Sequence, residues 1–152
     1  MSSRRKSREL ALCAYYAQEM SKNSTEQALN DVAILTEKVD QSVIAFAQKL
    51  LQKTIDLQVE CDDLIKAKAL NWDFKRIAIL DKLILRIAIC EFLQFEDIPP
   101  KVSIDEAIEI SKKFSTDKSG KFINGILDSI LNDLKNAGRI VKSGRGLLEK
   151  TL

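Results

Sequence analysis

The stretch from Ser115 to Asp128, STDKSGKFINGILD, contains the residue types of a phosphate-binding loop. In such a loop two glycines five positions apart are followed directly by Lys and by Ser or Thr, between a strand and a helix. The backbone amides then surround the phosphates. The lysines and serines here do not follow that spacing, and no strand is expected before them. A nucleotide-binding loop is therefore not predicted.

The start of a helix explains the same stretch better. Side-chain oxygens that can accept from the free amides of a first helical turn are present at Ser115, Thr116, Asp117 and Ser119. Lys118 and Lys121 would then lie near a helix N-terminus, where the dipole favours anions, so they could contact a nucleic-acid phosphate. The alternative is that both lysines are solvated. Gly125, inside the apolar stripe, predicts the close approach of a neighbouring helix.

A second group of cations stands at the N-terminus. Four basic residues precede the first acid, Glu9: Arg4, Arg5, Lys6 and Arg8. Basic segments of this kind bind nucleic-acid phosphates. Tyr15 and Tyr16, two to three turns farther along, could stack on unpaired bases, although at least one of them is expected to face the core. The alternative is a frayed terminus that only adds solubility.

The composition argues against catalysis and against metal binding. The chain contains no histidine, the commonest general base, and its three cysteines lie far apart without a CxxC pair. We expect no catalytic residue, no metal, no disulfide and no cofactor, and we expect all three cysteines to be small core residues. Asp62 and Asp63 are neighbours on a predicted helix, so they do not face each other and form no clamp.

The chain contains few residues that break helices. Only two prolines occur, Pro99 and Pro100, and the first glycine is Gly120. Apolar residues recur at helical spacing over residues 10–20, 43–65, 77–95, 103–114 and 122–134. A second, shorter helix is expected to follow Ser24 or Thr25, either of which could cap it. No stretch alternates apolar and polar residues with period two, as a strand would. The sequence therefore predicts an all-α fold, a compact helical bundle.

Several local signals place the ends of these helices. Asn71 or Asp73 can cap the element that follows. SIDE, at residues 103–106, has the pattern of a capping box, and Gly138 is a plausible helix stop. Segment 77–95 is apolar on nearly every side and is expected at the centre of the bundle. Asp81 interrupts it, as either a partner contact or a solvated residue.

The length of 152 residues suits one domain, which we place at residues 1–138 with a basic arm at its start, residues 2–8. Residues 139–152 form a basic tail, which is either mobile or a last helical turn docked through Leu147 and Leu148. The N-terminus has no long apolar segment of a signal peptide, and no apolar run is long enough to span a bilayer. A cytoplasmic protein is expected.

Three segments together resemble the bacterial transcription antitermination factor family NusB. They are RRKSRELALCAYYAQEM near the N-terminus, the middle segment from NWDFKRI to SKKFS, and SGKFINGILDSI near the end. The resemblance is close across residues 69–130 and recognisable across 4–19, about half the chain. It implies two packed helical sub-bundles and no catalytic activity.

The resemblance also implies partners. Members of this family bind boxA, a single-stranded RNA element of ribosomal-RNA leader transcripts, together with a small-subunit ribosomal protein that acts as NusE. With other Nus factors and RNA polymerase they suppress termination. An alternative is a helical protein-interaction module or homodimer without intrinsic RNA binding. A NusB-like domain also precedes the catalytic domain of some ribosomal-RNA methyltransferases, but no glycine-rich cofactor loop follows a strand here.

The family's motifs carry over residue by residue. The arginine-rich arm matches Arg4, Arg5, Lys6 and Arg8, and an aromatic residue at the RNA surface matches Tyr16. The KF of the last RNA-facing motif matches Lys121 and Phe122, and an acidic position at or near the NusE surface matches Asp81. Lys118 replaces an acid common in the family, which reverses the charge there, and Gln18 stands where a second aromatic is usual.

Overall fold

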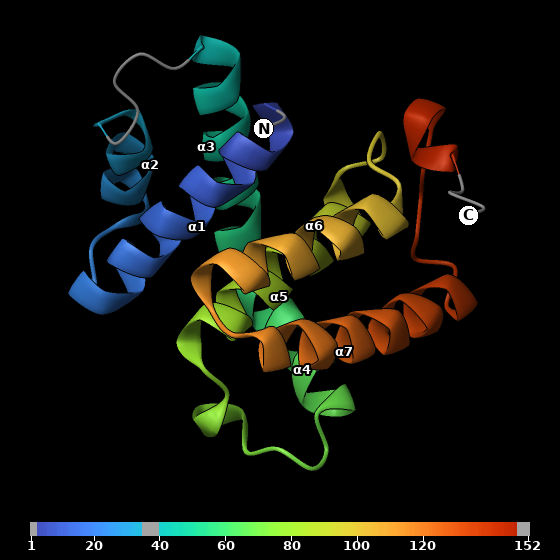
Figure 1. The fold of residues 1–152 in the computed structure, drawn as a ribbon. Coiled ribbons are helices and arrows are strands. Elements are labelled where there is room, and N and C mark those ends of the chain that lie inside the picture. Colours follow the sequence, from blue (N-terminus) through green and yellow to red (C-terminus); the bar gives the residue numbers. More distant parts are fainter. Residues whose placement is uncertain (1–2, 35–39, 149–152) are drawn as a thin grey trace. The chain divides into compact units, whose positions relative to one another are not determined.

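The computed structural model describes residues 3–34 and 40–148, and helices dominate these ranges (Figure 1). The predicted all-α fold is confirmed. The chain divides into two compact units, Met1–Leu57 and Gln58–Leu152. The first unit contains α1 (Ser3–Ser21), α2 (Thr25–Ile34) and α3 (Gln41–Asp56). The second contains α4 (Gln58–Lys68), η1 (Phe74–Arg76), α5 (Ile79–Gln94), α6 (Pro100–Phe114), α7 (Asp117–Asn136) and η2 (Gly144–Leu147).

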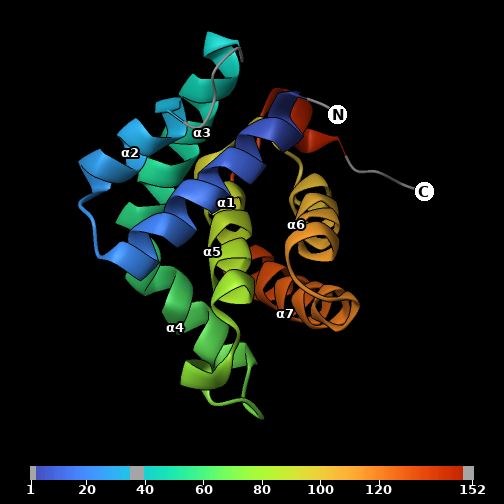
Figure 2. The same cartoon turned by 60° about the vertical axis from the view of Figure 1, so that its left-hand side comes forward.

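In the first unit α1 lies across α2 and α3, and both views show this arrangement (Figures 1 and 2). Apolar residues at helical spacing on α1 and α3 are buried, among them Leu12, Tyr15, Leu50 and Leu51. The hydroxyl of Ser7 donates to the backbone carbonyl of Val43 at 2.9 Å and joins α1 to α3. Because α1 begins at Ser3, the predicted arm is the first turns of a helix rather than an extended segment.

Two of the predicted boundaries in this part of the chain can be compared with the structure. Ser24 caps α2, since its hydroxyl accepts from the amide of Gln27 at 3.1 Å. The single long helix predicted over residues 43–65 is wrong, because the chain leaves helical geometry at Leu57. One turn earlier the Thr54 hydroxyl donates to the Leu50 carbonyl at 2.6 Å, a bond that tends to bend helices.

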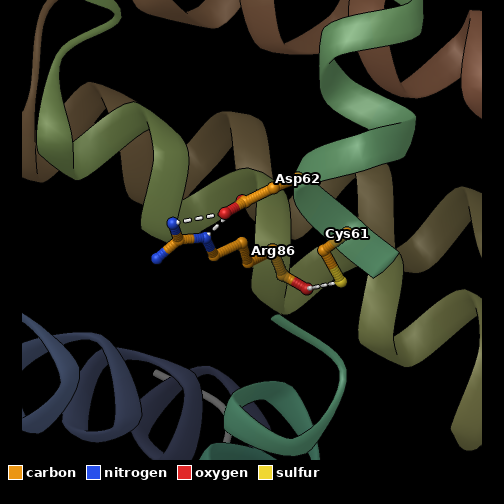
Figure 3. A network of polar contacts seen from close by, with 3 residues as sticks. All are labelled: Cys61, Asp62 and Arg86. Atoms are coloured by element: carbon orange, nitrogen blue, oxygen red, sulfur yellow. Dashed lines mark hydrogen bonds and ion pairs between the residues drawn. The ribbon is translucent and has the colours of Figure 1, made fainter. Parts of the chain in front are cut away.

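In the second unit α5 is the central helix, and α4, α6 and α7 all pack against it. Eleven of its sixteen residues are buried, as the nearly continuous apolar sequence predicts. Its arginine, Arg86, forms a bidentate ion pair with Asp62 of α4, with nitrogen to oxygen distances of 2.7 and 2.9 Å (Figure 3). The thiol of Cys61 donates to the Arg86 carbonyl at 3.7 Å. These contacts fix α4 on α5.

The capping box predicted at residues 103–106 is wrong. Helix α6 begins earlier, with Pro99 as its N-cap and Pro100 as its first residue, because proline has a preset φ and needs no amide partner there. Ser103 is therefore inside the helix and 2% exposed. Its hydroxyl donates to a carboxylate oxygen of Glu91 on α5 at 2.7 Å. A tertiary contact has replaced the local cap.

The predicted ends of α7 are confirmed. The Thr116 hydroxyl accepts from the amide of Ser119 at 3.2 Å and caps the N-terminus. At the other end Gly138 has a φ of +70°, which glycine adopts without steric cost. The amides of Gly138 and Arg139 bond back to the carbonyls of Lys135 and Leu134, the Schellman arrangement that ends many helices.

The described part of the tail, residues 139–148, is docked, but not through the predicted leucines. Leu147 and Leu148 are 66% and 64% exposed. Instead Gly146 lies so close to the Glu96 carbonyl that a Cβ there would come within 1.7 Å of its oxygen. Lys142 donates to the carbonyls of Glu91 and Phe95 at 3.0 and 2.7 Å, and its ammonium group lies at the C-terminus of α5, where the helix dipole favours a cation.

Candidate nucleic-acid interface

The N-terminal basic residues differ in how much of each side chain reaches the surface. Arg4 and Lys6 are exposed and Arg5 is half-buried, whereas Arg8 is only 3% exposed. The guanidinium of Arg4 lies 3.8 Å from the ring centroid of Phe46, a cation–π contact that orders it. Burial keeps Arg8 from presenting its charge to a phosphate in this conformation, so its predicted role as a surface contact does not fit the structure.

The two tyrosines of α1 point in different directions. Tyr15 is fully buried, which confirms that one of the pair faces the core, and Tyr16 is 38% exposed. Tyr16 follows Arg5 by eleven residues, three helical turns or about 16 Å, and therefore lies on the same side of the helix. A cation and an accessible aromatic ring thus share one face of α1, as a single-stranded nucleic acid requires.

In the second unit, Asp81 organises the start of α7. Its two carboxylate oxygens accept from the hydroxyls of Ser115 and Ser119 at 3.1 and 3.0 Å. The side chain is 7% exposed, so Asp81 is not a solvated residue. Its position ties the cap of α7 to the first turn of α5. The predicted contact with a partner protein stays a prediction.

The α7 start carries the predicted RNA residues of this unit. Lys118 and Lys121 are exposed and Phe122 is half-buried. Phe122 packs edge-on against Trp72, with ring centroids 5.3 Å apart and an angle of 69° between the planes. Trp72 is nevertheless 60% exposed. Both aromatic residues line a pocket of about 180 Å³, together with Arg76, Asp81 and Lys118 among others.

The segment before α5 holds Trp72 and Arg76 in place. Asp73 accepts from the amide of Lys75 at 3.1 Å and caps η1. Of the two predicted caps, Asn71 and Asp73, the structure therefore uses Asp73. The ammonium groups of Lys66 and Lys82 lie 4.8 and 4.5 Å from the centroid of the Phe74 ring, at the distance of cation–π contacts. These contacts attach the segment to α4 and α5, so the rings and cations around the pocket are positioned by helices.

Trp72 and Arg76 are site residues that were not predicted from the sequence. The segment NWDFKRI predicts a helix cap and carries part of the family resemblance, and it also places two aromatic residues close to two basic ones. Aromatic and basic residues together are a signal for nucleic-acid binding and would have identified both residues. The explanation of Gly125 was wrong as well, because nothing lies within 4 Å of a Cβ built there. Gly120 is the glycine that faces α6, at ordinary contact distance.

Two of the three cysteines are core residues, as expected. Cys61 and Cys90 are buried, whereas Cys13 is half-buried and is not a core residue. Burial, with help from the nearby Cys90 thiol and the Asp62 carboxylate, raises the pKa of Cys61 to about 12, which keeps it a thiol. Within the described ranges no group of His, Cys, Asp or Glu is arranged to hold a metal ion, and no helix is long and apolar enough to cross a membrane.

These features define a class: an all-helical protein whose two units each present cations beside an accessible aromatic ring. A model of the NusB family matches residues 5–132, and the chain belongs to the NusB family. Transcription antitermination protein NusB of Salinibacter ruber is 46% identical over 97% of this chain and 92% of its own length. The protein of that name in Chloroherpeton thalassium is 44% identical over 97% and 70%. Proteins of this family are antitermination factors rather than enzymes, so the chain is not an enzyme.

Solved structures agree with this assignment. The fold resembles that of T. maritima NusB, with a TM-score of 0.78, 31% identity and coverage of 88% of this chain and 93% of that one. It also resembles a chain in a crystal structure of the antitermination factors NusB and NusE in complex with double-stranded RNA. The TM-score there is 0.79 at 20% identity, over 88% and 98% of the two chains. This second likeness shows the fold.

Proposed function

We propose that the protein is an RNA-binding transcription antitermination factor that recognises a boxA-type single-stranded element in ribosomal-RNA leader transcripts. It acts in the cytoplasm with a small ribosomal protein in the role of NusE, and with other Nus factors and RNA polymerase. The observation that carries the proposal is the grouping of unpaired cations with two aromatic rings, of which Trp72 is exposed. Within the described residues, Lys118, Lys121 and Arg76 make no ion pair, and Trp72 and Phe122 lie beside them.

The chemistry of the surface supports RNA over a purely protein ligand. Exposed Lys and Arg supply affinity for phosphates through counterion release. Aromatic rings stack on bases of any identity once the bases are unpaired. The N-terminus of α7 adds the positive end of a helix dipole close to Lys118. Membership in the NusB family supports the boxA element and the NusE partner as the particular ligands.

Fluorescence anisotropy of a labelled boxA-like RNA tests the proposal, with the protein alone and with the ribosomal partner, over a range of salt concentrations. If about four cations contact phosphates, log affinity falls against log salt with a slope of about −3. Binding should tighten when the partner is present. Absence of RNA binding under both conditions, with strong self-association in sedimentation, would instead support the protein-interaction module.

A pair of charge-matched variants localises the contact. Lys118→Ala with Lys121→Ala removes two cations at the α7 start. The fall of log affinity with log salt should then become shallower by about 1.4 in slope. Lys101→Ala with Lys135→Ala removes two exposed lysines elsewhere in the same unit and is the control. Equal effects of the two double variants would show that only net charge matters, and would contradict binding at the α7 start.

A further inference from the structure

The pocket beside the α7 N-terminus has a composition that the phosphate-binding role of Lys118 and Lys121 does not explain. Two aromatic rings form part of its wall, Trp72 from the segment before η1 and Phe122 from α7. Arg76 and Lys118 line it from two different segments, and Asp81 contributes a carboxylate. The pocket therefore joins an apolar stacking surface, two cations and one anion within about 180 Å³.

The solvent exposure of Trp72 is unusual for its position. Tryptophan is the largest side chain and is highly buried on average, whereas Trp72 is 60% exposed although Phe122 packs against it. The edge-on contact uses the edge of one ring and the face of the other, so aromatic surface remains accessible. A ring held in this way loses little conformational entropy when a planar ligand stacks on it.

The charges decide which part of a nucleic acid fits the pocket. A phosphate would meet the carboxylate of Asp81 and two aromatic walls, and neither favours an anion. A base is planar, uncharged and rich in hydrogen-bonding groups, so it matches rings together with polar side chains. The exposed cations Arg76 and Lys118 can then contact the phosphates on either side of that base.

We propose that this pocket receives one unstacked base of the bound single-stranded RNA, with Trp72 as the stacking residue and with Arg76 and Lys118 on the flanking phosphates. This inference rests on the proposed RNA-binding function and adds to it a base-binding subsite. Lys121, one turn along α7 from Lys118, continues the path of the backbone away from the pocket.

The chain contains a single tryptophan and two tyrosines, so fluorescence excited at a wavelength that tyrosine does not absorb reports on this pocket. Titration with unlabelled single-stranded RNA should quench the emission of Trp72 in parallel with binding measured by anisotropy. Heparin, a polyanion without bases, should bind the cations without quenching. Equal quenching by heparin would show that the signal reports charge, and would overturn the stacking assignment.

Variants at the pocket give the second readout. Trp72→Ala should weaken RNA binding about 5- to 150-fold, the range for loss of one stacked base, while Trp72→Phe keeps most of the affinity. Leu70→Ala, two residues away and 82% exposed, is the matched control and should change nothing. An RNA with one abasic nucleotide at the stacking position should bind wild type and Trp72→Ala equally.

The outcomes separate this inference from the proposed function. Salt-sensitive RNA binding with no quenching, together with unchanged affinity in Trp72→Ala, overturns the base pocket and leaves the RNA-binding function intact. Complete absence of RNA binding by the wild-type protein, alone and with the ribosomal partner, overturns both. Circular dichroism of each variant, with wild-type helicity expected, excludes unfolding as the cause of a lost signal.

Discussion

The ion pair between Asp62 and Arg86 makes the replacement of Asp62 by alanine a sharp test of how the second unit is held together. The two side chains are 17% and 7% exposed, and the contact is bidentate (Figure 3). Removal of one partner from a buried pair costs about 3 to 5 kcal/mol, because the remaining charge stays buried without compensation. Asp62 retains some solvent contact, so we expect the lower end, about 3 kcal/mol.

Urea denaturation followed by circular dichroism measures this loss as a change in the free energy of unfolding. For a chain of this length the same loss lowers the melting temperature by about 6 to 12 °C. Asp63→Ala is the matched control, since Asp63 is the next residue on α4 but is exposed. We expect it to change stability by no more than about 0.5 kcal/mol.

A double variant separates the value of the pair from the cost of an unpaired charge. Asp62→Leu with Arg86→Met replaces both ions with apolar side chains of similar length, a change that is often neutral or stabilising. We expect the double variant to be more stable than Asp62→Ala. The reasoning would be refuted if Asp62→Ala lost less than about 1 kcal/mol relative to Asp63→Ala, because Arg86 would then be solvated after all.

Two further predictions concern titratable groups. Desolvation lowers the pKa of Lys142 below its ordinary value of 10.5, although Glu91, Asp97 and Glu96 oppose the shift. Between the pKa in the folded protein and the pKa of 10.5 in the unfolded chain, the unfolded chain therefore binds more protons. Wild type should therefore gain free energy of unfolding relative to Lys142→Met as pH rises through that window toward 10.5, and a difference that is constant between pH 7 and 10.5 would contradict this. Burial raises the pKa of Cys61 to about 12, so Cys61 should resist alkylation at pH 8 in the native protein, while half-buried Cys13 reacts first. Peptide mass spectrometry measures the two alkylation rates. Equal rates without denaturant would contradict this prediction.

Local chemistry explains the parts of the fold that could be predicted. The caps at Ser24 and Thr116 and the stop at Gly138 depend on hydrogen bonds within one turn of chain, and all three agree with the structure. The family resemblance rests on residues in a set order and is confirmed by the match over residues 5–132. The expectation of a central apolar helix is met by α5.

Two of the wrong predictions, the cap at Ser103 and the docking of the tail, share one cause, which is that a distant contact overrode a local signal. Ser103 has the spacing of a cap but bonds to Glu91, twelve residues earlier in the chain. Leu147 and Leu148 have the residue type that docks a tail, yet Gly146 and Lys142 make the contacts. No period or propensity encodes which residue another segment will meet.

The sequence by itself determined the helical class, most helix ends and the identity of the basic residues, because these follow from side-chain type and spacing along one chain. Only the tertiary structure decided which of those residues face solvent. The tertiary structure buries Arg8, and it buries Asp81 with hydrogen bonds from two serine hydroxyls. It also packs Trp72 against Phe122, fifty residues farther along the chain. A binding surface forms where segments remote in sequence meet, and their meeting depends on how the whole core packs.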